Sequence, residues 1–457
     1  MIGTIANIFR IQDLRKKILF TMALLAIYRI GFHIPIPGFN QAAIRHAAEN
    51  RGDAQNPLAR AADYLEIFTG GRFSQSSLFG LGIMPYITAS IILMLLGEVI
   101  PSLKKLRQEG QTGYKKIQEY TRYLTVLVCV MQAMMYLKLL LGVGVGEDRF
   151  IYPGMETQAM LLGVISMTAG TIFLMWLGEQ IDEYGIGNGI SLIIMAGIVA
   201  RTPWAIYQVI RQADFRIGAP AGSIGPAKIL FLAIAFVCVV AGAILITQGQ
   251  RRIPIQQAKQ MRGRRMYGGS RHYLPLRVNH GGVMPIIFAS SFMMFPPIIA
   301  EQLSRVFPSS IVLRRITSAL DGYTFTYDVL YMLLIILFAY FWVTVQFQPR
   351  EMAKNLRDSG SFIPGLRPGR RTAEYLETVM ARITYYGAAF LALISVIPNV
   401  AAVGLGVPPR ITAYLGGTGL LIVVSVSLDL VQKIEANLLM RSYEGFTSSG
   451  RIKGAYT

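Results

Sequence analysis

Long apolar runs dominate this chain of 457 residues and restrict it to folds that a lipid bilayer permits. A helix that spans the hydrocarbon core needs roughly 20 mainly apolar residues. The fifth run is the weakest, because Arg201, Thr202 and Pro203 interrupt it. The sequence therefore predicts an all-α polytopic membrane protein. Its ten transmembrane helices have apolar cores near residues 18–32, 78–100, 123–141, 159–177, 190–210, 229–246, 283–299, 329–345, 383–400 and 415–431.

Basic residues collect in the connections between these runs. The net charge is +19 although only 15% of residues are charged. Lysines and arginines precede the first run and fill the 2–3, 6–7 and 8–9 connections, with no acid between Gln248 and Gly282. Ten helices place all four segments on one side, which the positive-inside rule makes the cytoplasm. We therefore expect both termini in the cytoplasm, although the short 4–5 turn at 178–185 is acidic.

An internal repeat divides the chain. Residues 82–94 and 282–294 match at seven of thirteen positions, including the Gly, Met and Pro that begin each copy. Apolar helices also resemble one another by chance, because they use few residue types. The second helix enters from outside and the seventh from the cytoplasm, which is typical of inverted-topology repeats. We predict an N-terminal half, 1–217, and a C-terminal half, 218–457, of five helices each, divided near the polar stretch 218–226.

Chemistry within the membrane is not evident in the sequence. Arg29, Lys138 and Asp429 lie toward helix ends, where long or terminal side chains can reach water. The chain has no P-loop, zinc spacing or nucleophile elbow. Cys129 and Cys238 are isolated in apolar runs. The four histidines lie in or beside connections and are expected on the solvated surface. We predict neither an enzyme nor a cofactor or metal site.

Two kinds of segment could carry function. Residues 61–71 are too short to span, contain two acids and end in two glycines, which fits either an outer surface helix or a segment inside a water-filled cavity. The basic connections 248–282 and 349–378 are too long for tight turns. Their arginines either only set topology or bind an anionic partner, since guanidinium forks fit phosphates and carboxylates.

Several motifs, in the same order along the chain, resemble those of the SecY family. Members of this family are the central subunit of the bacterial protein-conducting channel. The motifs run from the first apolar helix toward the C-terminus: RIG…IPIPG at 29–38, FGLGIMPYI at 79–87, MWLGEQI at 175–181, GIGNGIS at 185–191, QRRIP at 250–254, LPLRVN at 274–279, FIPGLRPG at 362–369 and LGGTGLLIVV at 415–424. The resemblance implies two five-helix halves that form a clamshell around a central pore. It also implies a channel that passes unfolded secretory chains and releases apolar segments into lipid between the second and seventh helices.

The resemblance also implies roles for particular residues. A pore ring that seals the channel would consist of Ile83, Ile87, Ile190, Ile194, Ile287 and Ile422. A plug would include Tyr64, Leu65, Ile67, Phe68 and Thr69, and the lateral gate would include Thr88, Gln132 and Asn279. Arg251, Arg252 and Arg367 would bind cytoplasmic partners. The implied partners are SecE-like and SecG-like small membrane subunits, a SecA-like motor ATPase, the ribosome, signal sequences and the lipid of the bacterial cytoplasmic membrane.

The sequence departs from the family pattern near the gate and the plug. His280-Gly281-Gly282 replaces the expected Met-Ala-Gly before the seventh helix, and Arg72 follows the plug glycines. The main rival is a secondary transporter, which also fits ten helices with inverted repeats. It normally needs intramembrane acids or histidines. An intramembrane enzyme is a third reading, and it lacks any nucleophile–base or metal pair with suitable spacing.

Overall fold

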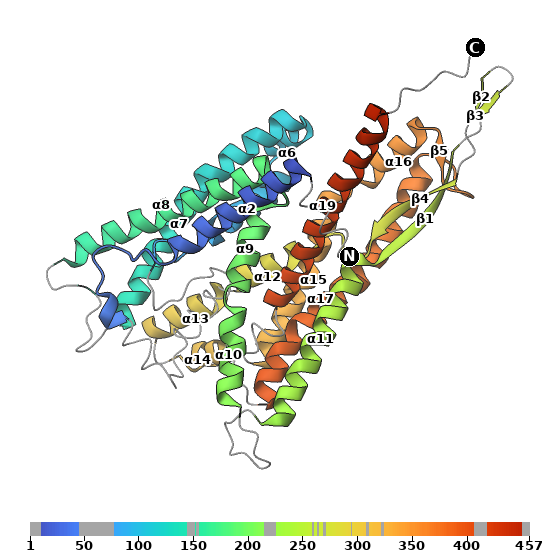
Figure 1. Cartoon of the computed structure of the whole chain (residues 1–457). Coiled ribbons are helices and arrows are strands. Elements are labelled where there is room, and N and C mark those ends of the chain that lie inside the picture. The colour runs from blue at the N-terminus through green and yellow to red at the C-terminus, as the bar shows by residue number, and fades with distance from the viewer. Residues whose placement is uncertain are drawn as a thin grey trace. The chain divides into compact units, whose positions relative to one another are not determined.

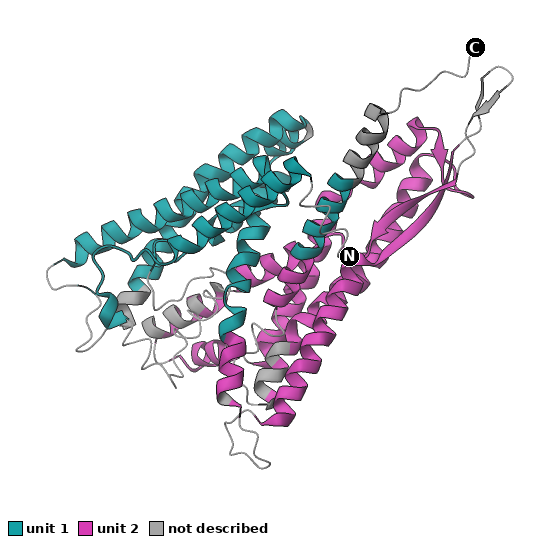
Figure 2. Cartoon of the chain, viewed as in Figure 1, with its two compact units in different colours: residues 1–204, 426–457 teal, residues 205–425 magenta. Residues whose placement is uncertain are grey.

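A computed structural model describes residues 11–44, 77–143, 151, 155–213, 225–257, 260–262, 265–267, 271–293, 295–307, 310–320, 324–405 and 418–449. The chain is divided into two compact units, residues 1–204 with 426–457 and residues 205–425 (Figures 1 and 2). The unit boundaries fall inside two helices, α10 (Thr202–Gln212) and α19 (Thr418–Ser449). The predicted division at 218–226 lies mostly outside the described residues, so the two five-helix halves stay a prediction.

Unit 1 is a bundle of helices. Its members besides parts of α10 and α19 are α2 (Gln12–Gly31), α5 (Met84–Val99), α6 (Pro101–Gln108), α7 (Gln111–Val143), α8 (Glu156–Tyr184) and α9 (Gly189–Val199). Pro101 occupies the first turn of α6, where a missing N–H costs nothing, and the chain bends by 105° there. Gly110, at a φ of +75°, then separates α6 from α7. Pro101 and Gly110 therefore explain why the helix breaks at these two points.

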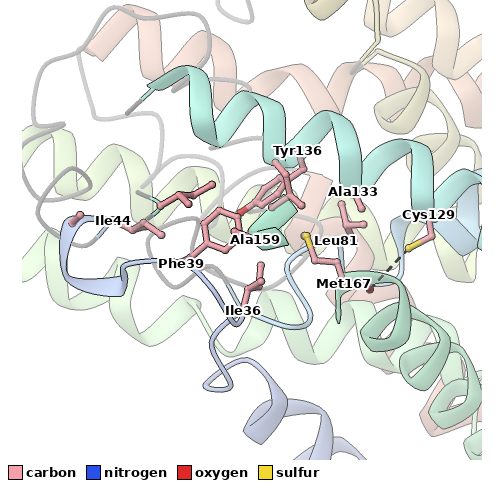
Figure 3. Packing of buried hydrophobic residues seen from close by; sticks show 12 residues of the cluster. Ile36, Phe39, Ile44, Leu81, Cys129, Ala133, Tyr136, Ala159 and Met167 are labelled. Carbon is pink, nitrogen blue, oxygen red and sulfur yellow. Dashed lines mark hydrogen bonds between the residues drawn. The ribbon is translucent and has the colours of Figure 1, made fainter. Parts of the chain in front are cut away.

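The core of unit 1 lies where α7 and α8 meet the segment that follows α2 (Figure 3). Cys129, Ala133 and Leu137 are completely buried on α7, and Met167 is completely buried on α8. Small residues let these helices approach closely: a Cβ on Gly163 would lie 2.7 Å from a methyl carbon of Leu137. The thiol of Cys129 faces the Met167 carbonyl at 4.0 Å. Cys129 is thus a packing residue, as the sequence indicated.

Unit 2 combines helices with two small sheets. Its helices, besides the remainder of α10 and α19, are α11 (Pro226–Gln248), α12 (Met284–Met293), α13 (Phe295–Val306), α14 (Ile311–Ala319), α15 (Phe325–Gln346), α16 (Pro349–Asp358) and α17 (Arg370–Leu405). Its strands are β1 (Gln250–Gln257), β2 (Gln260–Arg262), β3 (Arg265–Tyr267), β4 (Arg271–Arg277) and β5 (Ser361–Phe362). In the larger sheet β1 pairs antiparallel with both β4 and β5. The sequence predicted helices and basic connections, and it did not predict these strands.

Each of the ten predicted apolar runs overlaps a helix of the described residues. Five helical segments among those residues are long and apolar enough to span a membrane, or six if the bent pair α5 and α6 counts as one. The described part of α2 is less apolar because Arg15, Lys16 and Lys17 lie in its first turns. The structure is therefore that of a helical polytopic membrane protein with two small sheets. The larger sheet joins strands of the 6–7 and 8–9 connections, and the smaller one lies in the 6–7 connection.

Candidate functional site

The two copies of the repeat begin with the same backbone conformation. Gly82 has a φ of +57° and Gly282 a φ of +59°, which is the left-handed region that favours glycine. Two residues later Met84 and Met284 begin α5 and α12, each followed by proline in the first turn. The matching Gly-x-Met-Pro sequence thus encodes one turn-and-helix start that is used twice.

Aromatic packing surrounds the first of these turns. Phe79 precedes Gly82 by three residues, is 3% exposed, and its carbonyl accepts a hydrogen bond from the Gly82 N–H at 2.7 Å. Its ring contacts Phe32 edge-on at 5.7 Å and stacks on Phe173 at 6.0 Å. A Cβ on Gly31 would overlap the Phe79 ring, so α2 approaches this turn closely only because of that glycine. The turn before α5 is therefore held by apolar contact with α2 and α8.

A side-chain hydrogen bond closes the second turn. The Asn279 amide, in a side chain that is 8% exposed, donates to the Gly282 carbonyl at 2.9 Å. The neighbouring Gly281 fits against Pro285 and Trp342, because a Cβ there would lie 2.9 Å and 3.1 Å from their carbons. His280 packs edge-on against Phe347 with ring centroids 5.9 Å apart. The prediction of a solvated surface position was wrong for His280, which is half-buried.

The six isoleucines predicted to form a pore ring are placed on four helices or at their ends. Ile83 and Ile87 at α5, and Ile190 and Ile194 on α9, belong to unit 1, and all but the partly exposed Ile190 are buried. Ile287 on α12 and Ile422 on α19 belong to unit 2 and are 3% and 0% exposed. The members within each unit are thus buried apolar residues, and their membership of one ring stays a prediction.

The predicted gate residues differ in the bonds that they make. The Thr88 hydroxyl donates to the Met84 carbonyl of its own helix at 3.0 Å, which is a common way to satisfy a hydroxyl in an apolar helix. Gln132 is half-buried on α7. Asn279 is engaged by its own turn, as described above. The predicted plug residues at 64–69 lie outside the described residues.

The larger sheet of unit 2 carries Arg251 and Arg252, two of the three predicted docking arginines. Ile253 and Leu276 lie on one face, where they pack with Phe347, Leu376 and other apolar residues of the α15–α17 region. The opposite face carries Arg252, whose partner on β4 is Pro275, together with the exposed Tyr273 and Arg277. Arg251 and Arg367 are also exposed. The apolar face thus anchors a sheet whose other face is basic and accessible.

The sequence indicated no functional role for three charged residues of unit 1: Arg122, Glu179 and Arg201. Arg122 on α7 binds Glu179 on α8 through two hydrogen bonds of 2.9 Å. Such a two-point contact is the strongest arginine–carboxylate geometry. Arg201, at the break between α9 and α10, is only 8% exposed. Glu179 lies within the MWLGEQI motif. Arg122 lies on the preceding helix, α7, and this could have suggested the pair.

No group of three or more potential metal ligands occurs among the residues that the structure describes. The protein has instead a set of apolar helices, paired glycine turns and an exposed basic sheet.

The SecY family model matches residues 77–431. The protein translocase subunit SecY of Thermotoga maritima is 42% identical over 98% of both chains. The SecY subunit of Chlamydia muridarum is 40% identical over 99% of both. The chain belongs to the SecY family. This SecY-family chain is a subunit of a protein-conducting channel in a membrane, and it is not an enzyme.

Solved structures show the same fold for this SecY-family chain. A structure titled as that of a protein-conducting channel aligns with a TM-score of 0.61, covering 93% of each chain at 21% identity. Sec61 in the canine ribosome–channel complex aligns with a TM-score of 0.58 at 19% identity, again over 93% of each chain. The SecY resemblance read from the motifs is confirmed, as is the membrane-channel function. The helical membrane fold is confirmed with it.

Proposed function

We propose that the chain conducts unfolded secretory polypeptides through a pore sealed by Ile83, Ile87, Ile190, Ile194, Ile287 and Ile422. The observation that carries the proposal is that buried isoleucines occur at matching positions of both repeat helices, Ile87 and Ile287, one turn after the same glycine turn. Branched apolar side chains can close around a peptide without offering it fixed polar contacts. A dry constriction of this kind resists ions and water.

We propose further that apolar segments leave sideways between α5 and α12, past Thr88, Gln132 and Asn279. Each buried methylene favours lipid by ~0.8 kcal/mol, so the hydrophobicity of a signal sequence can bias a gate of a few kcal/mol. The left-handed glycines support this proposal, because they let each helix start abruptly from a turn. Residues 64–69 are proposed as the plug on sequence resemblance alone. The halves 1–217 and 218–457 are proposed as the two sides of the clamshell.

The partners follow from the absence of a motor motif and from the basic sheet. We propose that the exposed Arg251, Arg252 and Arg367 bind either a SecA-like ATPase or the ribosome, which supplies the pushing force. Signal sequences would bind at the gate, and SecE-like and SecG-like subunits would complete the channel within the lipid bilayer. The proposed location is the bacterial cytoplasmic membrane, with both termini and the sheet in the cytoplasm.

Ion leakage tests the ring. Replacing Ile87 and Ile287 together by glycine removes two branched side chains from the proposed seal, so planar-bilayer recordings of the resting channel should show increased conductance. The matched control is the pair Ile193→Gly and Ile286→Gly. These residues are 2% and 0% exposed and lie on α9 and α12, which carry ring residues, but they are outside the proposed ring. An unchanged conductance in the first pair, or an equal increase in the control pair, would contradict the ring assignment.

A further inference from the structure

Helix α14 lies in the connection between α13 and α15 and leaves its apolar side chains uncovered. Ile311, Val312 and Ile316 are 69%, 67% and 45% exposed, and none of its residues is buried. The helix is well formed nonetheless, because Ser310 accepts a hydrogen bond from the Leu313 N–H at its start. With nine residues it is too short to span a bilayer. An ordered helix with this much exposed aliphatic surface requires an apolar environment outside the protein.

The position of α14 is tied to the end of a membrane helix. The Thr324 hydroxyl donates to the Ala319 carbonyl at 2.7 Å and accepts from the Tyr327 N–H at 3.3 Å, so one threonine links the end of α14 to the start of α15. That start is also exposed, since Phe325 is 82% accessible. Phe325 heads an exposed stripe along α15 that continues with Val329, Leu333 and Leu337 at intervals of four residues. The end of α14 therefore lies next to the start of a candidate spanning helix that carries an exposed apolar stripe.

The exposed side of α14 also carries positive charge. Arg314 and Arg315 are exposed, and the helix contains no acid. Within the described part of the chain neither arginine forms an ion pair. At ~100° per residue Arg315 projects between Ile311 and Val312, within the apolar face, while Arg314 lies on the polar side next to Ile311. A short helix that has an exposed apolar face, arginines within and beside that face and no acid fits a position in the plane of a membrane surface.

We propose that α14 binds the surface of the bilayer, at the end of α15 opposite to the β1–β4 sheet, with Ile311, Val312 and Ile316 in the acyl boundary and both arginines on anionic phospholipid phosphates. Arginine suits this role because its stem can lie along apolar surface while its guanidinium reaches a phosphate. The binding fixes the 7–8 connection to lipid and is independent of the pore and gate proposed above. If the topology proposed above holds, this is the leaflet away from the cytoplasm.

Spin labels on the full-length protein in nanodiscs test the proposal. Cys238, which is exposed, is first replaced by Ala, whereas the buried Cys129 stays. Nitroxides are then attached at Ile316→Cys and at Ser318→Cys, an exposed polar position on the same helix. Leu333→Cys supplies a lipid reference and Tyr273→Cys a water reference. In phosphatidylglycerol discs we expect the label at 316 to collide with oxygen like the label at 333. The label at 318 should collide with a water-soluble nickel chelate like the label at 273.

The arginines are tested with Arg314→Gln and Arg315→Gln. Each replacement should lower the ratio of inserted to water-exposed label at 316 by about fivefold in phosphatidylglycerol discs, and much less in phosphatidylcholine discs. Equal nickel access at 316 and 318 in both lipids would overturn the proposal. Shielding of 316 from both reagents would also overturn it, because a protein partner and not lipid would then cover the helix. If that shielding disappears on dilution, the partner is a second copy of this chain.

Discussion

Gly82 and Gly282 start the two repeat helices with almost the same φ, +57° and +59°, but their surroundings differ in kind. The residue three positions earlier is Phe79 in the first copy and Asn279 in the second. Phe79 is clamped between rings of α2 and α8, whereas Asn279 bonds within its own turn. The same local geometry is therefore kept by a ring packed between other helices in one unit. In the other unit a side-chain hydrogen bond closes the turn, and Gly281 and His280 pack against Trp342 and Phe347.

The helices that follow also differ. After its turn α5 continues for 16 residues before the bend into α6. By contrast α12 has 10 residues, and the next helix, α13, begins with Phe295 followed by two prolines. Ala89 and Ala289 are completely buried in both copies, so the first turns pack alike and the divergence comes later. The second copy is thus the shorter of the two helices, although it packs closely on α15.

The largest difference in stability between the two copies should appear when Phe79 and Asn279, three residues before each glycine, are replaced by alanine. Phe79→Ala removes a ring that is 3% exposed and should lower the free energy of unfolding by about 3–5 kcal/mol. Asn279→Ala removes one hydrogen bond and should cost about 1 kcal/mol. Unfolding of the purified protein in mixed detergent, followed by circular dichroism, measures both.

Phe173→Ala is the control for this pair, since Phe173 stacks on Phe79 but is 38% exposed. It should cost clearly less than Phe79→Ala. Equal losses for Phe79→Ala and Asn279→Ala would mean that the two turns are held in the same way, and the comparison would fail.

A smaller effect is expected at Gly282 itself. Nothing lies within 4 Å of a Cβ placed there, so Gly282→Ala tests backbone strain alone, at about 1–2 kcal/mol. Gly282→Asn should cost less, because asparagine tolerates the left-handed region. Gly404 on α17 also has open space around a Cβ but has no positive φ, so Gly404→Ala should be neutral or slightly stabilising. Thermal unfolding of the three variants gives the order, and a loss at Gly404 equal to that at Gly282 would exclude strain as the cause.

The serines that the two copies share should also differ. Ser290 bonds to the Tyr331 hydroxyl at 2.8 Å, which links α12 to α15, and Tyr331 is 6% exposed. Within the described part of the chain no hydrogen bond between helices reaches the Ser90 hydroxyl. A double-mutant cycle of Ser290→Ala and Tyr331→Phe should give a coupling energy of about 0.6 kcal/mol, the usual size within membranes. Ser90→Ala should change stability less than Ser290→Ala, and the reverse order would refute the asymmetry.

The sequence predicted the repeat, the apolar runs and the family, because run length and Gly-Pro breaks act locally. It placed the start of the second run near residue 78, whereas α5 begins at Met84. It did not predict the forces around each turn. Phe79 depends on Phe32 and Phe173, which come from other helices, and no periodicity indicates such contacts. The β1–β4 sheet had a detectable signal, since Ile253 and Ile255 alternate with Arg252, Pro254 and Gln256, but the sequence analysis considered only the charge of this connection. The pore ring needs residues from both units, so burial within each unit supports it only in part.

The smallest expected effect is a pH dependence confined to the second copy. Burial lowers the pKa of His280 below its ordinary value of 6.5, and the Arg277 charge lowers it further. The unfolded chain then binds more protons than the folded protein near that pH, so stability falls as the pH decreases below about 6.5. His280→Gln should remove this part of the pH dependence, whereas Phe79→Ala should leave it unchanged although it costs more stability at neutral pH. Unfolding midpoints between pH 5 and 8 measure this dependence. An equal change of midpoint with pH in wild type and His280→Gln would show that His280 contributes nothing to the pH dependence of stability.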